Sequence, residues 1–257
     1  MRASVTVRVP GSTSNLGAGF DCVGVAVDRW LTLTARLASP ASTAVAIERR
    51  GTLDAVTVAA EQDLCYRGFR KACDAAGRTS PPPVLLSAAS GIPVARGLGS
   101  SAAAAVAGAA SANALLGLGL EPDALVDLCA ELEGHPDNVA PAVYGGAALA
   151  VRAATDNRLV VTALAVHASL ALAFAVPDFV VETRQARAVL PASVPHATAV
   201  TGAGRAAALI QGLASGDARL LALALDDVLH VPFRRALVSG YDAIARAAQQ
   251  AGAFGAT

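Results

Sequence analysis

Apolar and polar residues alternate or cluster at strand spacing in the first part of the chain, at residues 5–9 and again at 24–37. Between these two stretches lies PGSTSNLGAGFD, residues 10–21, a polar and glycine-rich segment that is typical of a loop. Further strands are predicted at 84–90, near 147–152 and within 160–176. The first half of the protein is therefore predicted to be built on a sheet.

The amphipathic-looking pattern at 64–76 predicts a helix, and the uncharged run of small residues from about residue 100 to 116 predicts a buried one. EPDALVDLCAELEG begins with acidic residues and proline, which suit a first helical turn, and this helix should end near Gly134. GHPDNVAPAVYGG follows as a predicted loop, and helical patterns dominate from Thr183 onward. This order of elements predicts an α+β chain whose domain boundary lies near residues 150–180.

Composition narrows the classes of protein that fit. The chain has 257 residues, of which 54% are hydrophobic and 16% charged, which is ample for a large core. Its formal net charge is zero and arginines are not gathered, so the charge pattern excludes nucleic acid and anionic membrane as partners. We therefore expect small-molecule partners. MRASVTVRVPGS lacks the apolar length of a signal peptide, which favours a cytoplasmic location.

Two apolar runs resemble membrane spans but are better explained by a core. The run after Arg96 consists mostly of Ala, Gly and Ser, which gain little from lipid, and predicts a buried helix. The run at 159–176 contains His167 and clusters of β-branched residues, and predicts two core strands.

Cysteine and lysine usage exclude several chemistries. Cys22, Cys65, Cys73 and Cys129 form no CxxC pair, so reduced and mostly buried thiols are expected. The single lysine, Lys71, lies in a helical pattern and does not follow a glycine-rich loop. A Walker A site, a protein kinase and a Schiff-base enzyme are therefore disfavoured.

The segment GIPVARGLGSSAAAAVAGAASANALLGL joins a glycine-rich turn to a helix almost without charged or large side chains. Gly97 and Gly99 can adopt positive φ, and successive backbone N–H groups before a helix N-terminus form a cradle for phosphate. Ser100 and Ser101 offer cap oxygens, hydrogen bonds to phosphate or a Mg²⁺ ligand. The alternative is an ordinary strand–turn–helix junction with a serine cap, and this segment alone does not decide between them.

Two further motifs favour the phosphate-binding interpretation of this segment. They are PGSTSNLGAGFD at 10–21 and ELEGHPDNVAPAVYGG at 131–146. With them the sequence resembles the GHMP small-molecule kinases, and SNLGAGFD and HPDNVAPA are similar to the homoserine kinase family within that superfamily. TRQARAVLP and DDVLHVPFR extend the resemblance over essentially the whole chain. It implies the two-domain GHMP kinase fold, with a ribosomal-protein-S5-like α/β domain at 1–160 and a ferredoxin-like α+β domain at 161–257. A homodimer is left open.

The resemblance implies transfer of the γ-phosphate of ATP to the hydroxyl of L-homoserine, which gives O-phospho-L-homoserine for threonine biosynthesis. It places Mg²⁺ on Ser101, or its neighbour Ser100, together with Glu133, and Glu131 is the alternative ligand. Two residues apart on one helix, Glu131 and Glu133 cannot share a face, so at most one should point at the metal. ATP is expected on Pro93, Val94, Ala95, Arg96, Gly97, Leu98, Gly99, Ser100, Ser101, Ala102 and Ala103.

The substrate residues that the resemblance implies carry groups for an ammonium, a carboxylate and a hydroxyl. Asp21 and Asp137 suit the ammonium or hydroxyl, and an arginine fork suits the carboxylate or the transferring phosphate. No general base is assigned, and loop, helix-end or surface roles are the alternatives for single residues. The substrate set is Asn15, Asp21, His135, Asp137, Thr183, Arg187 and Arg234, and the residues expected at the reacting groups are Asn15, Asp137, Asn138 and Arg187.

The sequence also departs from the family pattern. Asp63 stands where relatives often carry an Asn near the adenine, and Gly202 stands where they commonly carry an Asn. The chain ends AQQAGAFGAT, without the Ser-Gly-Ala-Gly-Pro motif that follows in the family. We therefore expect an incomplete enzyme with an unpaired edge strand, uncovered apolar surface and little kinase activity. The rival functions are a mevalonate or phosphomevalonate kinase and a metabolite sensor without turnover.

Overall fold

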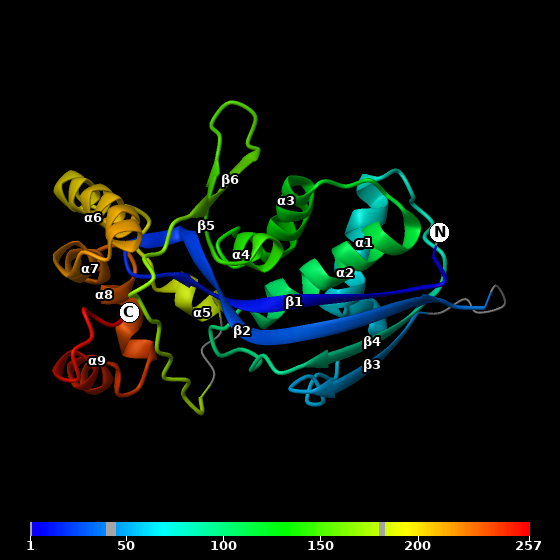
Figure 1. The fold of residues 1–257 in the computed structure, drawn as a ribbon, viewed down its shortest axis with the longest axis horizontal. Coiled ribbons are helices and arrows are strands. Elements are labelled where there is room, and N and C mark those ends of the chain that lie inside the picture. Colours follow the sequence, from blue (N-terminus) through cyan, green and yellow to red (C-terminus); the bar gives the residue numbers. More distant parts are fainter. Residues whose placement is uncertain (1, 40–44, 180–182) are drawn as a thin grey trace.

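A computed structural model describes residues 2–39, 45–179 and 183–257 of the chain. A twisted sheet carries helices on one face, and a group of helices gathers at the end of the sheet where the chain terminates (Figure 1). The structure therefore confirms a mixed α+β fold.

The two N-terminal strands are longer than the sequence pattern predicts. β1 (Ser4–Asn15) and β2 (Gly19–Leu37) pair antiparallel across the whole expected loop, apart from a turn at residues 16–18. The register shifts between Pro10 and Gly11 and again between Ser14 and Asn15. These bulges accommodate the glycine- and proline-containing motif without ending the pairing, so the prediction of a loop at 10–21 is wrong except at the turn.

The described strands form one sheet in the order β3-β4-β2-β5-β6, with β1 also paired to β2. The remaining strands are β3 (Ala46–Gly51), β4 (Val84–Ser90), β5 (Ala147–Arg152) and β6 (Leu159–Leu164). Only β3 and β4 pair parallel. Burial alternates strictly along β4, which confirms the predicted strand and shows that one face of the sheet is open.

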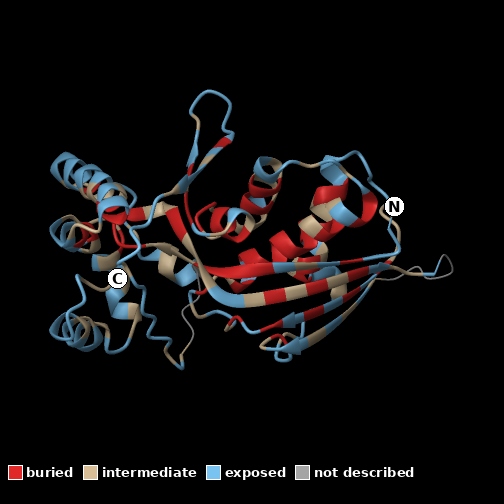
Figure 2. Cartoon of the chain, viewed as in Figure 1, coloured by how far each residue is buried: buried red, intermediate tan, exposed pale blue. Residues whose placement is uncertain are grey.

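Helices α1 (Leu64–Ala75), α2 (Ser100–Leu116), α3 (Pro122–Glu133) and α4 (Val139–Tyr144) lie on the other face (Figure 1). The first three confirm the predicted helices, whereas α4 occupies part of a predicted loop. α2 lies at the centre of the core (Figure 2). A Cβ atom on Gly108 would lie 1.8 Å from the Cys65 carbonyl oxygen, and one on Gly68 would lie 2.1 Å from that of Ala105. The small residues of α2 therefore allow α1 to pack directly against its backbone.

The last part of the chain is helical, as predicted from Thr183 onward. It contains α5 (Thr183–Ala188), α6 (His196–Ser215), α7 (Ala218–Leu225), α8 (Val231–Arg234) and α9 (Tyr241–Gln250). Short 3₁₀ helices occur at Ala60–Gln62 and Arg235–Leu237. No helix in the described part of the chain is long and apolar enough to cross a membrane.

The prediction of two core strands within 159–176 is only partly right. β6 ends at Leu164, and the described residues from 165 onward form no strand. Side chains that were expected in the core are exposed there, among them Leu172 and Phe174, because no described strand pairs with this segment. The expected boundary between residues 160 and 161 falls inside β6, and the division into two domains stays a prediction.

A second, smaller hydrophobic cluster joins the helical end to the sheet. Leu209 and Leu213 of α6 pack with Leu221 of α7 against Leu16 of the β1–β2 turn and Val23 of β2. The helices that follow the sheet are thereby fixed beside the β1–β2 turn.

Candidate active site

The loop between β4 and α2 has the backbone shape of an anion-binding cradle. Ala95, Gly97 and Gly99 all have positive φ, at 55°, 71° and 66°, in alternation with their neighbours. Gly99 is the N-cap of α2, and no side chain caps this helix. The alternative of a serine cap is therefore not what the structure shows, and the first N–H groups of α2 are not occupied by a capping side chain.

Ser12 of β1 holds this loop in place. Its backbone N–H donates to the Leu98 carbonyl at 3.1 Å, and a Cβ on Gly99 would lie only 2.2 Å from the Ser12 hydroxyl oxygen. The same hydroxyl donates to the Asn138 carbonyl at 2.9 Å. Ser12 is fully buried, so one side chain connects the glycine-rich loop to the HPDN segment.

The other residues expected at ATP differ in what they can offer. The side chains of Leu98, Ala102 and Ala103 are buried in the core, so only their backbone can face a ligand. The Arg96 guanidinium donates to the Asp178 carbonyl at 2.7 Å. Pro93 and Val94 directly precede Ala95, the first positive-φ residue of the loop, and the Val94 side chain is exposed.

Glu131 and Glu133, the two alternative metal ligands of the sequence analysis, have different partners in the structure. The Ser101 hydroxyl donates to Glu133 Oε2 at 2.6 Å, whereas Glu131 forms an ion pair with Lys71 at 2.6 Å. Burial raises the pKa of Glu133, and the Ser101 hydrogen bond and the charge of His135 oppose that rise. Glu133 is therefore the glutamate that lies at the start of α2, beside the glycine-rich loop.

The β1–β2 turn presents two polar residues in left-handed conformations. Asn15 and Asp21 have φ of 72° and 57°, and the Asn15 side-chain oxygen accepts from the Asp21 backbone N–H at 2.9 Å. Non-glycine residues rarely adopt such angles, so the conformation is held by the turn and its contacts.

The HPDN segment packs against the same turn. Asp137 is buried, and its Oδ1 contacts His135 Nδ1 at 2.6 Å and accepts from the Asn138 N–H at 2.8 Å. The Asn138 amide donates to the Ser14 hydroxyl at 3.0 Å. Hydrogen bonding to Asp137 raises the pKa of His135 against the opposing effect of burial.

Two arginines reach this region from the helical end. Arg187 donates two parallel hydrogen bonds to Asp21, at 3.0 and 2.9 Å. Arg234 donates to the Ala186 carbonyl at 2.8 Å, and its guanidinium lies 5.0 Å from the centre of the Phe20 ring. Thr183 begins α5, but its side chain lies outside the described part of the structure.

The expected substrate residues form one electrostatic unit. Partial burial lowers the pKa of Arg234, while the carboxylates of Asp21 and Asp137 favour its charged form. The charge of Arg187 acts on His135, and those of His135 and Asp137 act on Glu133. Residues from four separate segments of the sequence therefore lie close enough to influence one another's protonation.

Some residues of this region escaped the sequence analysis. Ser12, Ser14, Phe20 and His230 all contact expected site residues or the turn between them. All four lie inside motifs that were recognised, so their position was available from the sequence. Their contacts were not, because each partner is remote in the chain.

The two departures from the family pattern have structural roles here. Asp63 is the N-cap of α1, accepting from the Cys65 N–H at 2.8 Å, and it forms a buried ion pair with Arg49 at 2.8 Å. Gly202 is buried on α6, where an added Cβ would lie 3.0 Å from the Leu229 side chain.

The four cysteines are free, with Cys22 half-buried and the other three buried. Burial raises the pKa of Cys73 to about 11 and that of Cys129 to about 12. These thiols stay protonated near neutral pH and have the character of core residues.

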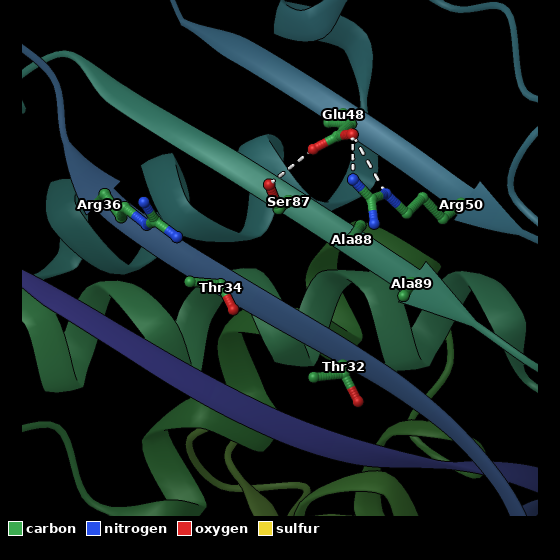
Figure 3. Close-up of a pocket in the computed structure, with 8 residues that line it drawn as sticks. All are labelled: Thr32, Thr34, Arg36, Glu48, Arg50, Ser87, Ala88 and Ala89. Carbon is green, nitrogen blue, oxygen red and sulfur yellow. Dashed lines mark hydrogen bonds and ion pairs between the residues drawn. The ribbon is translucent and has the colours of Figure 1, made fainter.

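A pocket of about 320 Å³ lies elsewhere, on the open face of the sheet (Figure 3). Glu48 is hydrogen-bonded there to Arg50 and Ser87. None of the expected site residues lines this pocket, so it is separate from the candidate active site. Its lining is Thr32, Thr34, Arg36, Glu48, Arg50, Ser87, Ala88 and Ala89.

Comparisons with known proteins show which proteins this chain is similar to. The family model for the GHMP kinases N terminal domain matches residues 63–146, which include the glycine-rich loop, Glu133 and HPDN. Homoserine kinase of Gloeobacter violaceus is 44% identical over 97% of this chain and 82% of its own length. Homoserine kinase of Synechococcus sp. is also 44% identical, over 98% of this chain and 81% of its own length.

A solved structure extends the likeness to the fold. The crystal structure of homoserine kinase from Cytophaga hutchinsonii superposes with a TM-score of 0.84 at 31% identity, and the match covers 99% of this chain and 81% of that one. The loop, the paired Ser101 and Glu133, and the polar turn thus occur in a chain similar to these kinases over nearly its whole length. The chain belongs to the homoserine kinase family of the GHMP kinases.

Proposed function

We propose that this protein transfers the γ-phosphate of ATP to the side-chain hydroxyl of L-homoserine, giving O-phospho-L-homoserine. The observation that carries the proposal is the convergence of an uncapped helix N-terminus, a serine–glutamate pair and a zwitterion-matching set of charges. Ser12 joins the loop before the uncapped helix to the HPDN segment. The charges of His135 and Asp137 act on the pKa of Glu133.

The glycine-rich loop and the start of α2 provide the phosphate-binding part. Positive φ at Ala95, Gly97 and Gly99 turns successive N–H groups toward one side of the loop. The helix dipole favours negative charge at the same point. The ATP phosphates are proposed to bind here, which leaves the reacting phosphorus near Ser101 and Glu133.

Ser101 and Glu133 fit a Mg²⁺ ion by the chemistry of their oxygens. Within 2–39, 45–179 and 183–257, no three His, Cys, Asp or Glu side chains gather as a metal-binding group. Mg²⁺ commonly needs only one or two protein oxygens besides substrate phosphates and water. When bound, the ion would neutralise charge on the phosphates, and Ser101 and Glu133 are the residues that would hold it.

The substrate part suits an amino acid with a free ammonium and carboxylate. Asp21 and Arg187 are paired with each other in the structure. Homoserine carries the opposite charge for each partner, so its ammonium suits Asp21 and its carboxylate suits Arg187 or Arg234. Mevalonate lacks the ammonium and would therefore bring no cationic group of its own to Asp21. Asn15, His135, Asp137 and Asn138 are proposed to orient the hydroxyl, and no general base is assigned.

The test is a coupled ADP-release assay with homoserine, mevalonate and phosphomevalonate as acceptors, combined with phosphorus NMR of the product. Homoserine should be the preferred acceptor and should give a phosphate monoester. Turnover with mevalonate and none with homoserine would contradict the proposal. Tight ATP binding with no phosphorylated product from any acceptor would favour a sensor.

The domain division, the cellular location and the oligomeric state are proposed alongside the activity. The S5-like domain at 1–160 and the ferredoxin-like domain at 161–257 are proposed from the family resemblance, and the hydrophobic cluster of α6 and α7 with Leu16 and Val23 would lie between them. Limited proteolysis that releases a stable fragment near residue 160 would support the division. A cytoplasmic location and a homodimer stay predictions, and sedimentation velocity tests the second.

A further inference from the structure

His230 and Asp227 form a buried connection between the helical end of the molecule and the β1–β2 turn. Both are almost inaccessible, with 5% and 6% of their surface exposed. His230 Nε2 lies 2.9 Å from the Gly17 carbonyl oxygen, although the two residues are 213 positions apart. Because a carbonyl only accepts, Nε2 carries the proton in this contact.

The turn that His230 contacts is the one that carries Asn15 and Asp21. The Ala18 N–H donates to the Ala224 carbonyl of α7 at 2.9 Å. Gly17 has a φ of 75°, and a Cβ there would lie 2.5 Å from the same carbonyl. The tip of the turn is therefore fixed by α7 on one side and by His230 on the other.

His230 also lies beside an expected substrate residue. Its ring stacks on Phe20 with centroids 4.8 Å apart and an interplanar angle of 21°. The Arg234 guanidinium lies 5.0 Å from the centre of the same Phe20 ring. Phe20 directly precedes Asp21, so one aromatic ring contacts the arginine and neighbours the carboxylate of the proposed substrate site.

Asp227 fixes the chain that carries His230 and Arg234. Its Oδ2 accepts from the N–H groups of Leu229, His230 and Val231, at 3.0, 2.6 and 2.8 Å. Its Oδ1 is buried and has no hydrogen-bond partner among the described residues. One carboxylate oxygen therefore holds three consecutive backbone groups at the start of α8.

From these contacts we infer that His230 and Asp227 are positioning residues for homoserine binding. They hold the β1–β2 turn and Arg234 at fixed places relative to each other. Their hydrogen bonds reach the β1–β2 turn and the start of α8, whereas the glycine-rich loop is held by Ser12. The inference rests on the proposed function.

The test compares variants that separate the hydrogen bond of His230 from its ring. His230→Phe keeps the ring on Phe20 and loses the donor, and His230→Gln keeps a donor at the distance of Nε2. Homoserine affinity is measured by titration calorimetry, together with KM for each substrate, kcat and Tm. His196→Phe, at the exposed start of α6, is the matched control.

His230→Phe should weaken homoserine binding by about tenfold, the effect of losing one buried hydrogen bond. The KM for ATP should change by less than about twofold in the same variant, because the phosphate loop is untouched. His230→Gln should retain homoserine binding within about threefold of wild type, and His196→Phe should match wild type.

A His230→Phe protein with a lower Tm but unchanged homoserine affinity would overturn the inference, as would equal losses for homoserine and ATP. If His230→Phe fails to fold, His230→Gln and His230→Asn decide, because Asn is too short to reach Gly17. Equal homoserine affinity in that pair would overturn the inference. A wild-type protein that binds ATP but neither binds nor phosphorylates homoserine would instead contradict the proposed function.

Discussion

Asp21 and Arg187 lie 166 residues apart in the sequence and are joined by two parallel hydrogen bonds of 3.0 and 2.9 Å. Asp21 lies at the start of β2, directly after the β1–β2 turn, and Arg187 lies in α5. The two proposed binding groups for opposite ends of an amino acid thus pair with each other.

This pairing predicts coupled effects of mutation. Asp21→Asn should raise the KM for homoserine far more than the KM for ATP. Arg187→Lys loses the fork, and should weaken homoserine use if Arg187 holds the carboxylate or lower kcat if it holds the phosphate. In the double variant the losses should be non-additive by about 1 kcal/mol or more, measured from kcat/KM. Strict additivity, or an Asp21→Asn effect confined to ATP, would contradict the assignment.

Glu133 and Glu131 offer a matched pair on one helix. Glu133→Gln should lower kcat by about 100-fold, the usual loss when one electrostatic partner is removed from a reaction centre, while the fold survives. Glu131→Gln should stay within about twofold of wild type, since its partner Lys71 forms an exposed ion pair. Steady-state kinetics over a Mg²⁺ titration provides the measurement. The reverse ranking would move the metal role to Glu131.

The His135–Asp137 contact predicts a pH-dependent contribution to stability. Hydrogen bonding to Asp137 raises the pKa of His135 above its ordinary value of 6.5, so the folded state holds the proton more tightly than the unfolded chain. The contribution is fully present below the unfolded pKa and is lost as pH rises through the higher folded pKa. The difference in unfolding free energy between wild type and His135→Gln should therefore be larger near pH ~5.5 than near pH ~9.

Urea unfolding of both proteins at each pH tests this, with His196→Gln as the exposed control. A difference that stays constant, or that grows toward alkaline pH, would show that the contact does not stabilise the charged imidazole.

A substitution at Gly108 tests the contact between α1 and α2, and Gly204 in α6 provides the control. Gly108→Ala should destabilise the protein by about 2–4 kcal/mol, because the new Cβ would lie 1.8 Å from the Cys65 carbonyl and must push two helices apart. Gly204→Ala, in α6, meets no atom within 4 Å and should stabilise by about 0.5–1 kcal/mol through helix propensity alone. Denaturant unfolding measures both. Equal effects would mean that α1 and α2 tolerate separation.

Local patterns in the sequence determined much of the framework. Helices α1 and α3 and strand β4 lie where periodicity places them, because each buries one face and so repeats its apolar residues at the spacing of its own backbone. Helix α2 is buried on nearly all sides, and its uncharged run of small residues predicted it instead. The glycine-rich loop was recognisable for a similar reason, since positive φ and close approach restrict a position to few residue types.

The tertiary structure alone decided the features that join distant segments. The motif at 10–21 becomes strand because β1 and β2 pair through two bulges, and the segment after Leu164 is exposed because no described strand pairs with it. Glu133 was distinguished from Glu131 only by the positions of Ser101 and Lys71. Likewise, the pairing of Asp21 with Arg187 and of Gly17 with His230 depends on the path of the whole chain. Spacing along the sequence records the local backbone, whereas hydrogen bonds and ion pairs form between whichever groups the fold brings within about 3 Å of each other.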